Sequence, residues 1–240
     1  MRIPLIILPG YRRYLQLQER FGYKRLIVPI GSDCHPAYVL AKLNIRRYSL
    51  PFDWLNMEPI NSLSYVSVNM VDGFNWFMSD LVRNAQGHII SSRYPQAEFM
   101  HEKKLIEDAS DVLRMKKRAE RLLHFHKERA CAFMHTIPAV CVVSAEVVDT
   151  ILENVVQFRT LIKEGDTIHI YLRHDERDLE NIEHTRALYN GLRELDKVSA
   201  AQYVRHKATK GIWGDPTDYA DLMRSIGLDI HLRLPRILIT

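Results

Sequence analysis

The second half of the chain alternates between short apolar runs and longer amphipathic stretches, and this alternation constrains the fold most. The apolar runs predict strands at 130–134, 167–172 and 199–204, and the amphipathic stretches predict helices at 145–162 and 178–195. A helix between two strands is the connection that parallel strands require. The pattern predicts an α/β fold with a mainly parallel sheet flanked by helices, in a three-layer, Rossmann-like arrangement.

Another strand and helix are predicted near the start. Residues 25–30 form an apolar, β-branched run that ends at Gly31, and Pro36 suits the first turn of a helix with an apolar face running to Leu43. Residues 31–35 therefore form a turn from strand to helix. We also expect a short helix at 15–21 and another at 216–226, capped by Asp215 and stopped by Gly227.

Between these two parts, residues 50–129 look mostly helical. The spacing of apolar residues predicts helices at 61–71, 74–82 and 103–129, with extended pieces at 88–91 and 97–100. No linker or repeat marks a boundary. We therefore expect one α/β domain over 1–240, with 50–129 as a helical insertion within it.

Charge and composition exclude several classes of protein. Lysine and arginine number 33 against 29 acidic residues, a formal net charge of +4, and the basic cluster at Lys116–Arg118 lies in a helical pattern near Glu120. We interpret that cluster as a solvated face and expect no nucleic-acid partner. No signal peptide or membrane span is recognisable, and three cysteines suggest no disulfide framework, so a cytoplasmic location is expected. No metal or nucleotide motif is present, so no cofactor is predicted; the oligomeric state is left open.

Polar side chains gather where the predicted strands end. Ligands of open parallel sheets bind beyond the carboxyl ends of the strands. Such residues can also lie there only because the chain reaches water, but together they predict a rim that holds an anionic or polar part of a substrate. The predicted substrate-binding residues are Ser32, Asp33, His35, His135, Arg173, His174, Arg205 and His206.

Cys34 is the sharpest single candidate for chemistry. A thiol at a helix N-terminus has its thiolate favoured by the helix dipole, so we expect a pKa below that of a free cysteine, with nearby amides available to an oxyanion. A purely structural cysteine is the alternative. Cys131 and Cys141 lie in or near apolar stretches and are interpreted as packing residues.

Two motifs resemble a known family. The turn Gly31-Ser32-x-Cys34-x-Pro36-Ala37, followed by LNIRRYSLPFDWL, is similar to a bacterial family of unknown function described as "putative papain-like cysteine peptidases". The cysteine turn and the Pro-Phe-Asp-Trp block, within Arg46 to Trp54, are the specific part of the resemblance. His101-Glu102 and the basic helix near Lys116–Arg121 match more loosely. The resemblance implies Cys34 as nucleophile, a histidine as base and an acid as orienter; we expect His101 and Asp53 in the last two roles.

These features predict a cysteine-dependent hydrolase or acyltransferase. Its substrate would be an ester, thioester or amide on a small molecule, glycan or peptide, and the resemblance suggests a role near glycan biosynthesis. Two alternatives stay open. One is a transferase for glycan- or nucleotide-sugar-linked donors, with Arg173 and Arg205 on the phosphates. The other is a non-catalytic binding protein with the same fold.

Overall fold

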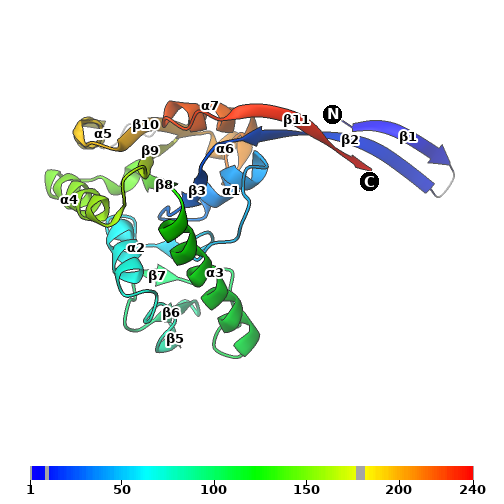
Figure 1. Ribbon diagram of the computed structural model, residues 1–240. Helices are drawn as coiled ribbons and strands as arrows, with labels where there is room; N and C mark the ends of the chain where they lie inside the picture. Colours follow the sequence, from blue (N-terminus) through cyan, green and yellow to red (C-terminus); the bar gives the residue numbers. More distant parts are fainter. Residues whose placement is uncertain (1, 9–10, 177–181, 240) are drawn as a thin grey trace.

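A parallel four-stranded sheet forms the centre of the computed structural model, which describes residues 2–8, 11–176 and 182–239. The strand order is β10-β9-β8-β3, and Figure 1 shows the sheet with helices around it. Its strands are β3 (Leu26–Pro29), β8 (Cys131–Pro138), β9 (Thr167–Asp175) and β10 (Val198–Arg205). Because the strands are parallel, their carboxyl ends meet at one edge, where the turn after β3 also lies.

Helices cover both faces of this sheet. Side chains alternate along each strand, so Phe133 and Ile170 join one apolar core while Met134 and Tyr171 join another. The first core also holds residues of α4 (Ala145–Leu161) and α5 (Ile182–Glu194); the second holds residues of α1 (His35–Lys42) and α7 (Tyr219–Ser225). The predicted α/β fold with a parallel sheet flanked by helices is confirmed. The strand order follows the sequence without the reversal of a doubly wound sheet, so the Rossmann-like arrangement is not confirmed.

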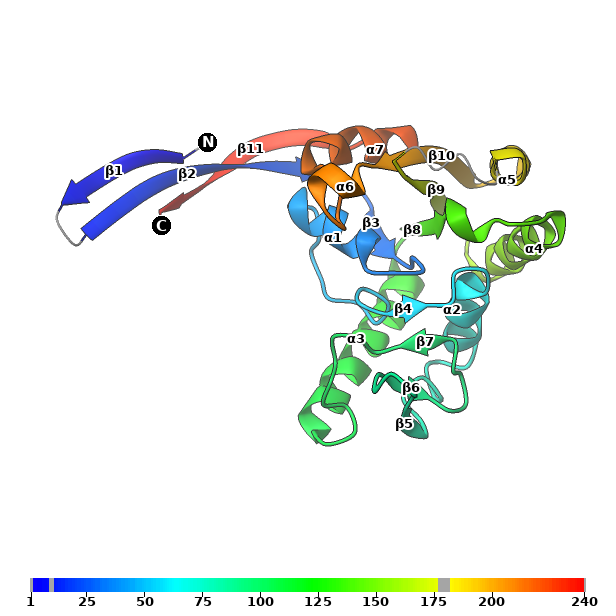
Figure 2. The same cartoon turned by 180° about the vertical axis from the view of Figure 1, so that it is seen from behind.

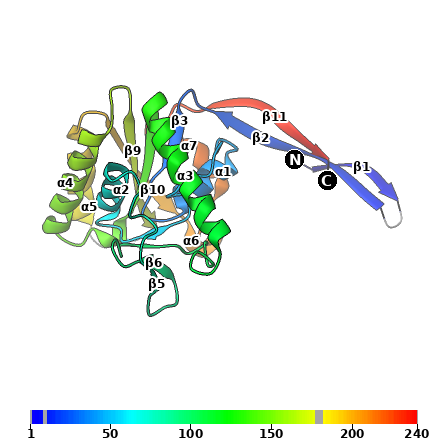
Figure 3. The same cartoon turned by 60° about the horizontal axis from the view of Figure 1, so that its bottom comes forward.

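Residues 50–129 contain a small sheet as well as helices. Helices α2 (Ser62–Val71) and α3 (Ala109–Glu128) accompany an antiparallel sheet, seen from below in Figure 3. The strands of this sheet, in spatial order, are β4 (Asn56–Met57), β7 (Ala97–Glu98), β6 (Ile89–Ser91) and β5 (Leu81–Arg83).

The helix predicted at 74–82 is wrong. Phe74 and Asp80 have φ angles of 62° and 51°, and Gly73 before them has a φ of 65°. A right-handed helix cannot pass through these left-handed positions, so the segment forms turns and then β5. Its aromatic residues still serve the core: Phe74 and Phe77 pack on Phe52.

A three-stranded antiparallel ribbon extends from the body. It consists of β1 (Arg2–Leu8), β2 (Tyr11–Gly22) and β11 (His231–Ile239), in the order β1-β2-β11. Figures 1 and 2 show the ribbon reaching far beyond the central sheet. The helix predicted at 15–21 is therefore wrong, because that segment pairs with β11 from the opposite end of the sequence. Strand β11 was not predicted.

The other predicted elements are present with shifted bounds. Ser144 Oγ accepts a hydrogen bond from the Val147 amide at 3.3 Å and caps α4, and Gly227, with a φ of 79°, follows α7. Strand β8 runs four residues past its predicted end and β9 three, because each still has a partner strand there. Helix α3 begins at Ala109, where Asp108 caps it. Residues 178–181, the predicted start of α5, lie outside the described residues.

The remaining elements are short. They are the helix α6 (Lys207–Lys210) and the 3-10 turns η1 (Ala139–Cys141) and η2 (Pro216–Asp218). Within the described segments, none of the helices has the length and apolar character needed to cross a membrane.

Candidate active site

A cysteine and a histidine from distant parts of the sequence meet beside the carboxyl end of β3. Cys34 is the N-cap residue of α1, and its Sγ atom lies 3.8 Å from His101 Nε2. Pro36, which lacks an amide hydrogen, is the second residue of the helix and suits its first turn. Cys34 is partly exposed and His101 is exposed, so a molecule from solvent can reach both. The structure thus brings together the predicted nucleophile and the predicted base.

The surroundings of Cys34 favour the protonated thiol. Burial raises the pKa of Cys34, and the neighbouring Asp33 carboxylate raises it further, while the Cys34 amide and Arg173 offset only part of the rise. The lowered pKa expected from the helix dipole is therefore wrong. In the resting protein, the sulfur needs a base to remove its proton.

Asp33 is fixed by two partners. Its Oδ2 accepts a hydrogen bond from Arg173 Nη1 at 2.6 Å, and its Oδ1 accepts one from the His35 amide at 2.9 Å. Burial alone would raise the pKa of Asp33, but the guanidinium of Arg173 and the amide outweigh it and lower the pKa. Asp33 is therefore ionised at neutral pH. The His35 amide hydrogen is bound to Asp33, and Pro36 has no amide hydrogen. Neither of the two residues after Cys34 can therefore donate to an oxyanion.

A chain of contacts leads from Asp53 to the His101 ring. The rings of Trp54 and His101 have centroids 5.3 Å apart, and the Arg46 guanidinium lies 5.2 Å from the Trp54 centroid. Asp53 accepts hydrogen bonds from Arg46, including one from Nε at 3.1 Å, and one from the Leu50 amide at 2.9 Å. The structure therefore connects Asp53 to His101 through Arg46 and Trp54, and the hydrogen bonds of the Asp53 carboxylate go to Arg46 and Leu50.

Asp53 itself is buried. Burial raises the pKa of Asp53, and Arg46 and the Leu50 amide oppose this only partly. The contacts through Arg46 and Trp54 were missed from sequence, although both residues belong to the block from Arg46 to Trp54. Their pattern alone does not reveal which ring the indole touches.

A second acid lies beside His101. Glu102 is buried, and its Oε1 accepts a hydrogen bond at 2.8 Å from Arg118 Nη1 on α3. Its Oε2 is buried and has no hydrogen-bond partner among the described residues. This ion pair joins the His101 segment to α3. It also explains why the basic stretch of that helix is not wholly a solvated face.

Two clefts lie next to the pair. One, of about 660 Å³, is lined by Ser32, Asp33 and Arg173 together with Cys141 and residues of β4 and β7. The other, of about 580 Å³, is lined by His101 and by residues 86–89 and 99–100. Cys141 is thus half-buried at a cleft wall. An extended substrate could use either cleft as it reaches the sulfur.

His35 and His135 are buried and their rings are engaged within the protein. His35 lies 2.6 Å from the Tyr171 hydroxyl through Nδ1 and 3.1 Å from the Trp213 carbonyl through Nε2. His135 Nδ1 donates to the Ile30 carbonyl at 2.7 Å. Burial lowers the pKa of each histidine to about 4. Both are neutral at pH 7, and neither ring faces the clefts.

The other predicted rim residues spread along the sheet edge. Arg205 donates to both oxygens of Asp175 at 2.6 Å, and its Nη1 donates to the Ile212 carbonyl. His174 is half-buried at the end of β9, and His206 is exposed before α6. Of the predicted binding residues, only Ser32, Asp33 and Arg173 line a cleft beside Cys34. The rest stay predictions.

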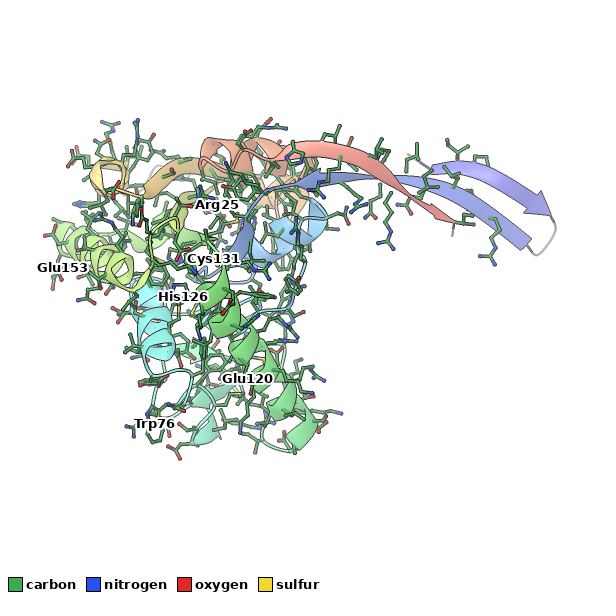
Figure 4. The ribbon with its side chains drawn as sticks, viewed as in Figure 1. Arg25, Trp76, Glu120, His126, Cys131 and Glu153 are labelled. Carbon is green, nitrogen blue, oxygen red and sulfur yellow. The ribbon has the colours of Figure 1, made fainter. Side chains whose placement is uncertain are left out.

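Cys131 belongs to the opposite edge of the sheet. It begins β8 and is fully buried, and its amide donates to Asp166 at 2.7 Å. Figure 4 shows Cys131 between Arg25 and His126 in the middle of the molecule. His126 is 3.3 Å from the same carboxylate. Cys131 is thus a packing residue of the core. Among the described residues, no group of three or more histidine, cysteine or acidic side chains is arranged to hold a metal ion.

Comparisons with known proteins give one family match and one curated relative. Residues 25–198 match the model of a family described as "Putative papain-like cysteine peptidase". A segment of 64 residues is 38% identical to an uncharacterized protein of Acanthamoeba polyphaga mimivirus and covers 26% of this chain and 29% of that protein. That relative is viral, so the expected bacterial origin of the family stays a prediction. No solved structure matches the chain. The matched region spans more than half of the chain, so the chain belongs to the family described as "putative papain-like cysteine peptidases".

Proposed function

We propose that the protein is a cysteine hydrolase in which Cys34 attacks a carbonyl carbon and His101 is the general base. The observation that carries this proposal is the distance of 3.8 Å between Cys34 Sγ and His101 Nε2 at a partly exposed position. A nucleophile within reach of a base is the arrangement that covalent catalysis requires, and such contacts are looser without substrate.

The first step is proton transfer and attack. His101 Nε2 takes the thiol proton as the sulfur bonds to the carbonyl carbon of an ester, thioester or amide. The tetrahedral intermediate collapses as the leaving alcohol, thiol or amine takes that proton from the imidazolium. An acyl group then remains on Cys34. Attack by water, with its proton passing to His101, releases the acid and restores the thiol.

Contacts on two sides position the base. Trp54 limits the tilt of the His101 ring, and Arg46, held by Asp53, fixes the indole in turn. Asp53 therefore acts as a positioning residue rather than as a direct partner of the imidazole. Glu102, next to His101 and tied to Arg118, holds the segment that carries the base.

The substrate would carry a polar or anionic group. Arg173 lines the cleft beside Ser32, and among the described residues its ion-pair partner is one carboxylate, Asp33, bound through Nη1. Because the family is peptidase-like, a peptide amide is the first candidate. An acyl acceptor other than water would make the same site an acyltransferase.

The geometry supports a hydrolase better than a transferase that would bind phosphates through Arg173 and Arg205 at the carboxyl edge of the sheet. All three nitrogens of Arg205 donate to Asp175 or to the Ile212 carbonyl, so its guanidinium is not free for a phosphate. Arg173, bound to Asp33 through Nη1, is then left as a single guanidinium at this edge, which suits one anionic group rather than the two phosphates of such a donor. A non-catalytic protein would have no need for an exposed imidazole against a thiol.

Trapping of the acyl-enzyme tests the proposal. The protein is mixed with a panel of p-nitrophenyl esters and peptide thioesters, quenched in acid and digested, and the Cys34 peptide is weighed by mass spectrometry. We expect the acyl mass on Cys34, none on Cys141, and none in His101→Gln within the same time. Acylation of Cys34 at the same rate in His101→Gln would contradict the role of the base, and no acylation by any probe would contradict the nucleophile.

A further inference from the structure

A pocket rich in arginine lies where the ribbon joins the body. Its volume is about 480 Å³, and four arginines line it: Arg20, Arg46, Arg47 and Arg236. No aspartate or glutamate is among its lining residues. A hollow of this size is within the range of small-ligand sites, which run from about 300 to 1,000 Å³.

The walls of this pocket come from two separate parts of the chain. Arg20 on β2 and Arg236 on β11 lie on the same face of the ribbon, since Arg236 pairs with Gln18, two residues from Arg20. The opposite wall is the end of α1 and the loop from Arg46 to Ser49. The family match covers residues 25–198, so the ribbon arginines come from outside the region that the family model describes.

Backbone and side-chain contacts hold the two walls together. The Phe21 amide donates to the Leu43 carbonyl at 3.1 Å, and Asn44 Nδ2 donates to the Glu19 carbonyl at 2.8 Å. Arg47 Nη2 donates to the Tyr23 carbonyl at 3.4 Å. The arginines are thus presented by fixed backbone, and a ligand meets a preformed site.

The positive charge of the pocket is largely uncompensated. Arg46 pairs with Asp53 behind the wall, but in the described parts of the chain no acidic side chain lies within 4.0 Å of the guanidinium groups of Arg20, Arg47 or Arg236. Across the ribbon, Arg20 also directly opposes Arg233. Like charges in directly opposed cross-strand positions destabilise a sheet unless an anion lies near them.

We propose that this pocket binds the phosphate group of a small phosphorylated molecule. Guanidinium groups match phosphate oxygens through paired hydrogen bonds, and several arginines suit the double charge of a phosphate better than the single charge of a carboxylate. The site shares Arg46 with the contacts that hold Trp54 and His101, so it borders the proposed active site but does not include Cys34.

Calorimetric titration of the full chain with inorganic pyrophosphate at constant low ionic strength tests this site. The variants are Arg20→Gln and Arg236→Gln, and the matched control is Arg186→Gln, an exposed arginine on α5 at the far side of the body. We expect saturable binding of one pyrophosphate, weakened about tenfold or more by each pocket variant and less than about twofold by the control. Circular dichroism checks that the variants stay folded.

The test separates this site from the proposed hydrolase. Cys34→Ala is titrated as well, and its affinity should equal that of the wild type whether or not Cys34 is a nucleophile. No saturable binding, equal weakening by Arg186→Gln, or binding of malonate as tight as that of pyrophosphate would overturn the proposal. Affinity for oligonucleotides that rises with their length would also overturn it, because it would show a polyanion surface.

Discussion

Cys34 Sγ and His101 Nε2 lie 3.8 Å apart although 67 residues separate them in the sequence. The segment between them forms α1, α2 and the small antiparallel sheet, and it returns the histidine to the turn after β3. The buried Glu102–Arg118 pair then ties this segment to α3. The relative position of thiol and imidazole thus depends on the packing of residues 50–129 on the sheet.

The first prediction concerns the ionisation of Cys34. Because burial and Asp33 raise the pKa of this thiol, its alkylation by iodoacetamide should accelerate with a midpoint above about 8.5, the value of an ordinary cysteine. Asp33→Asn removes the adjacent negative charge and should lower that midpoint. Peptide mass spectrometry against pH measures both.

Cys141 is the internal control for this experiment. Burial and then Glu58, not Asp33, raise the pKa of Cys141, so its midpoint should not move in Asp33→Asn. A Cys34 midpoint below about 7.5 would contradict the assigned environment and favour the helix-dipole effect expected from sequence.

The second prediction concerns the base. His101→Gln should lower the rate of Cys34 acylation by about 10²–10⁴-fold, the usual contribution of general base catalysis. Stopped-flow release of p-nitrophenol measures it. The matched control is His124→Gln, an exposed histidine on α3, which should keep the wild-type rate. Equal acylation rates in the two variants would contradict the assignment of His101 as the base.

The third prediction concerns the ion pair between Arg46 and Asp53. Arg46→Met leaves the buried Asp53 carboxylate without its cation, and we expect a loss of about 3 kcal/mol in the free energy of unfolding. Urea titration measures this loss. Arg83→Met, from the exposed pair with Glu107, should change the free energy of unfolding far less, because water solvates both charges of that pair.

Asp53→Asn separates the effect of Asp53 on the position of His101 from its effect on the stability of the fold. The amide keeps the shape and a hydrogen-bond acceptor but loses the charge that holds Arg46. In the folded variant we expect a lower kcat with KM little changed, since the substrate clefts do not include Asp53. A change confined to KM would place Asp53 in substrate binding instead.

The fourth prediction concerns stability against pH. Burial lowers the folded-state pKa of His35 and His135 to about 4, whereas the unfolded chain binds these protons near pH 6.5. The unfolded state therefore holds more protons between about pH 6.5 and 4, and stability falls as pH decreases through that window. The slope should approach about 1.4 kcal/mol per pH unit for each histidine.

Urea titrations at several pH values measure this slope. His135→Gln should remove about half of the contribution, because only His35 then titrates differently in the two states. A free energy of unfolding that stays constant from pH 6.5 to 4.5 would show that the two rings are not held neutral.

Local signals in the sequence predict part of this structure well. Pro36 and the apolar residues after it define α1, and Ser144 defines the start of α4, because caps and periodicity act within a few residues. The pairing of Cys34 with His101 came from a resemblance in the motifs rather than from any local rule. Because the strands are parallel, the turn after β3 lies at the edge of the sheet where the carboxyl ends of all four strands meet.

The failures have non-local causes. Strand β2 pairs with β11 from the other end of the sequence, so nothing near residues 15–21 signals the partner. The pKa of Cys34 depends on tertiary burial and on the orientation of Asp33, which Arg173 on β9 fixes. His135 was expected at a strand end, but β8 continues past it and encloses its ring.

The carboxylate beside the nucleophile also affects how the sulfur survives between reactions. Peroxides oxidise thiolates to sulfenic and sulfinic acids far faster than they oxidise thiols. Since burial and Asp33 raise the pKa of Cys34, hydrogen peroxide should oxidise this sulfur more slowly than it oxidises an ordinary exposed cysteine. Asp33 therefore lowers the reactivity of Cys34 toward electrophiles and also protects it from oxidation.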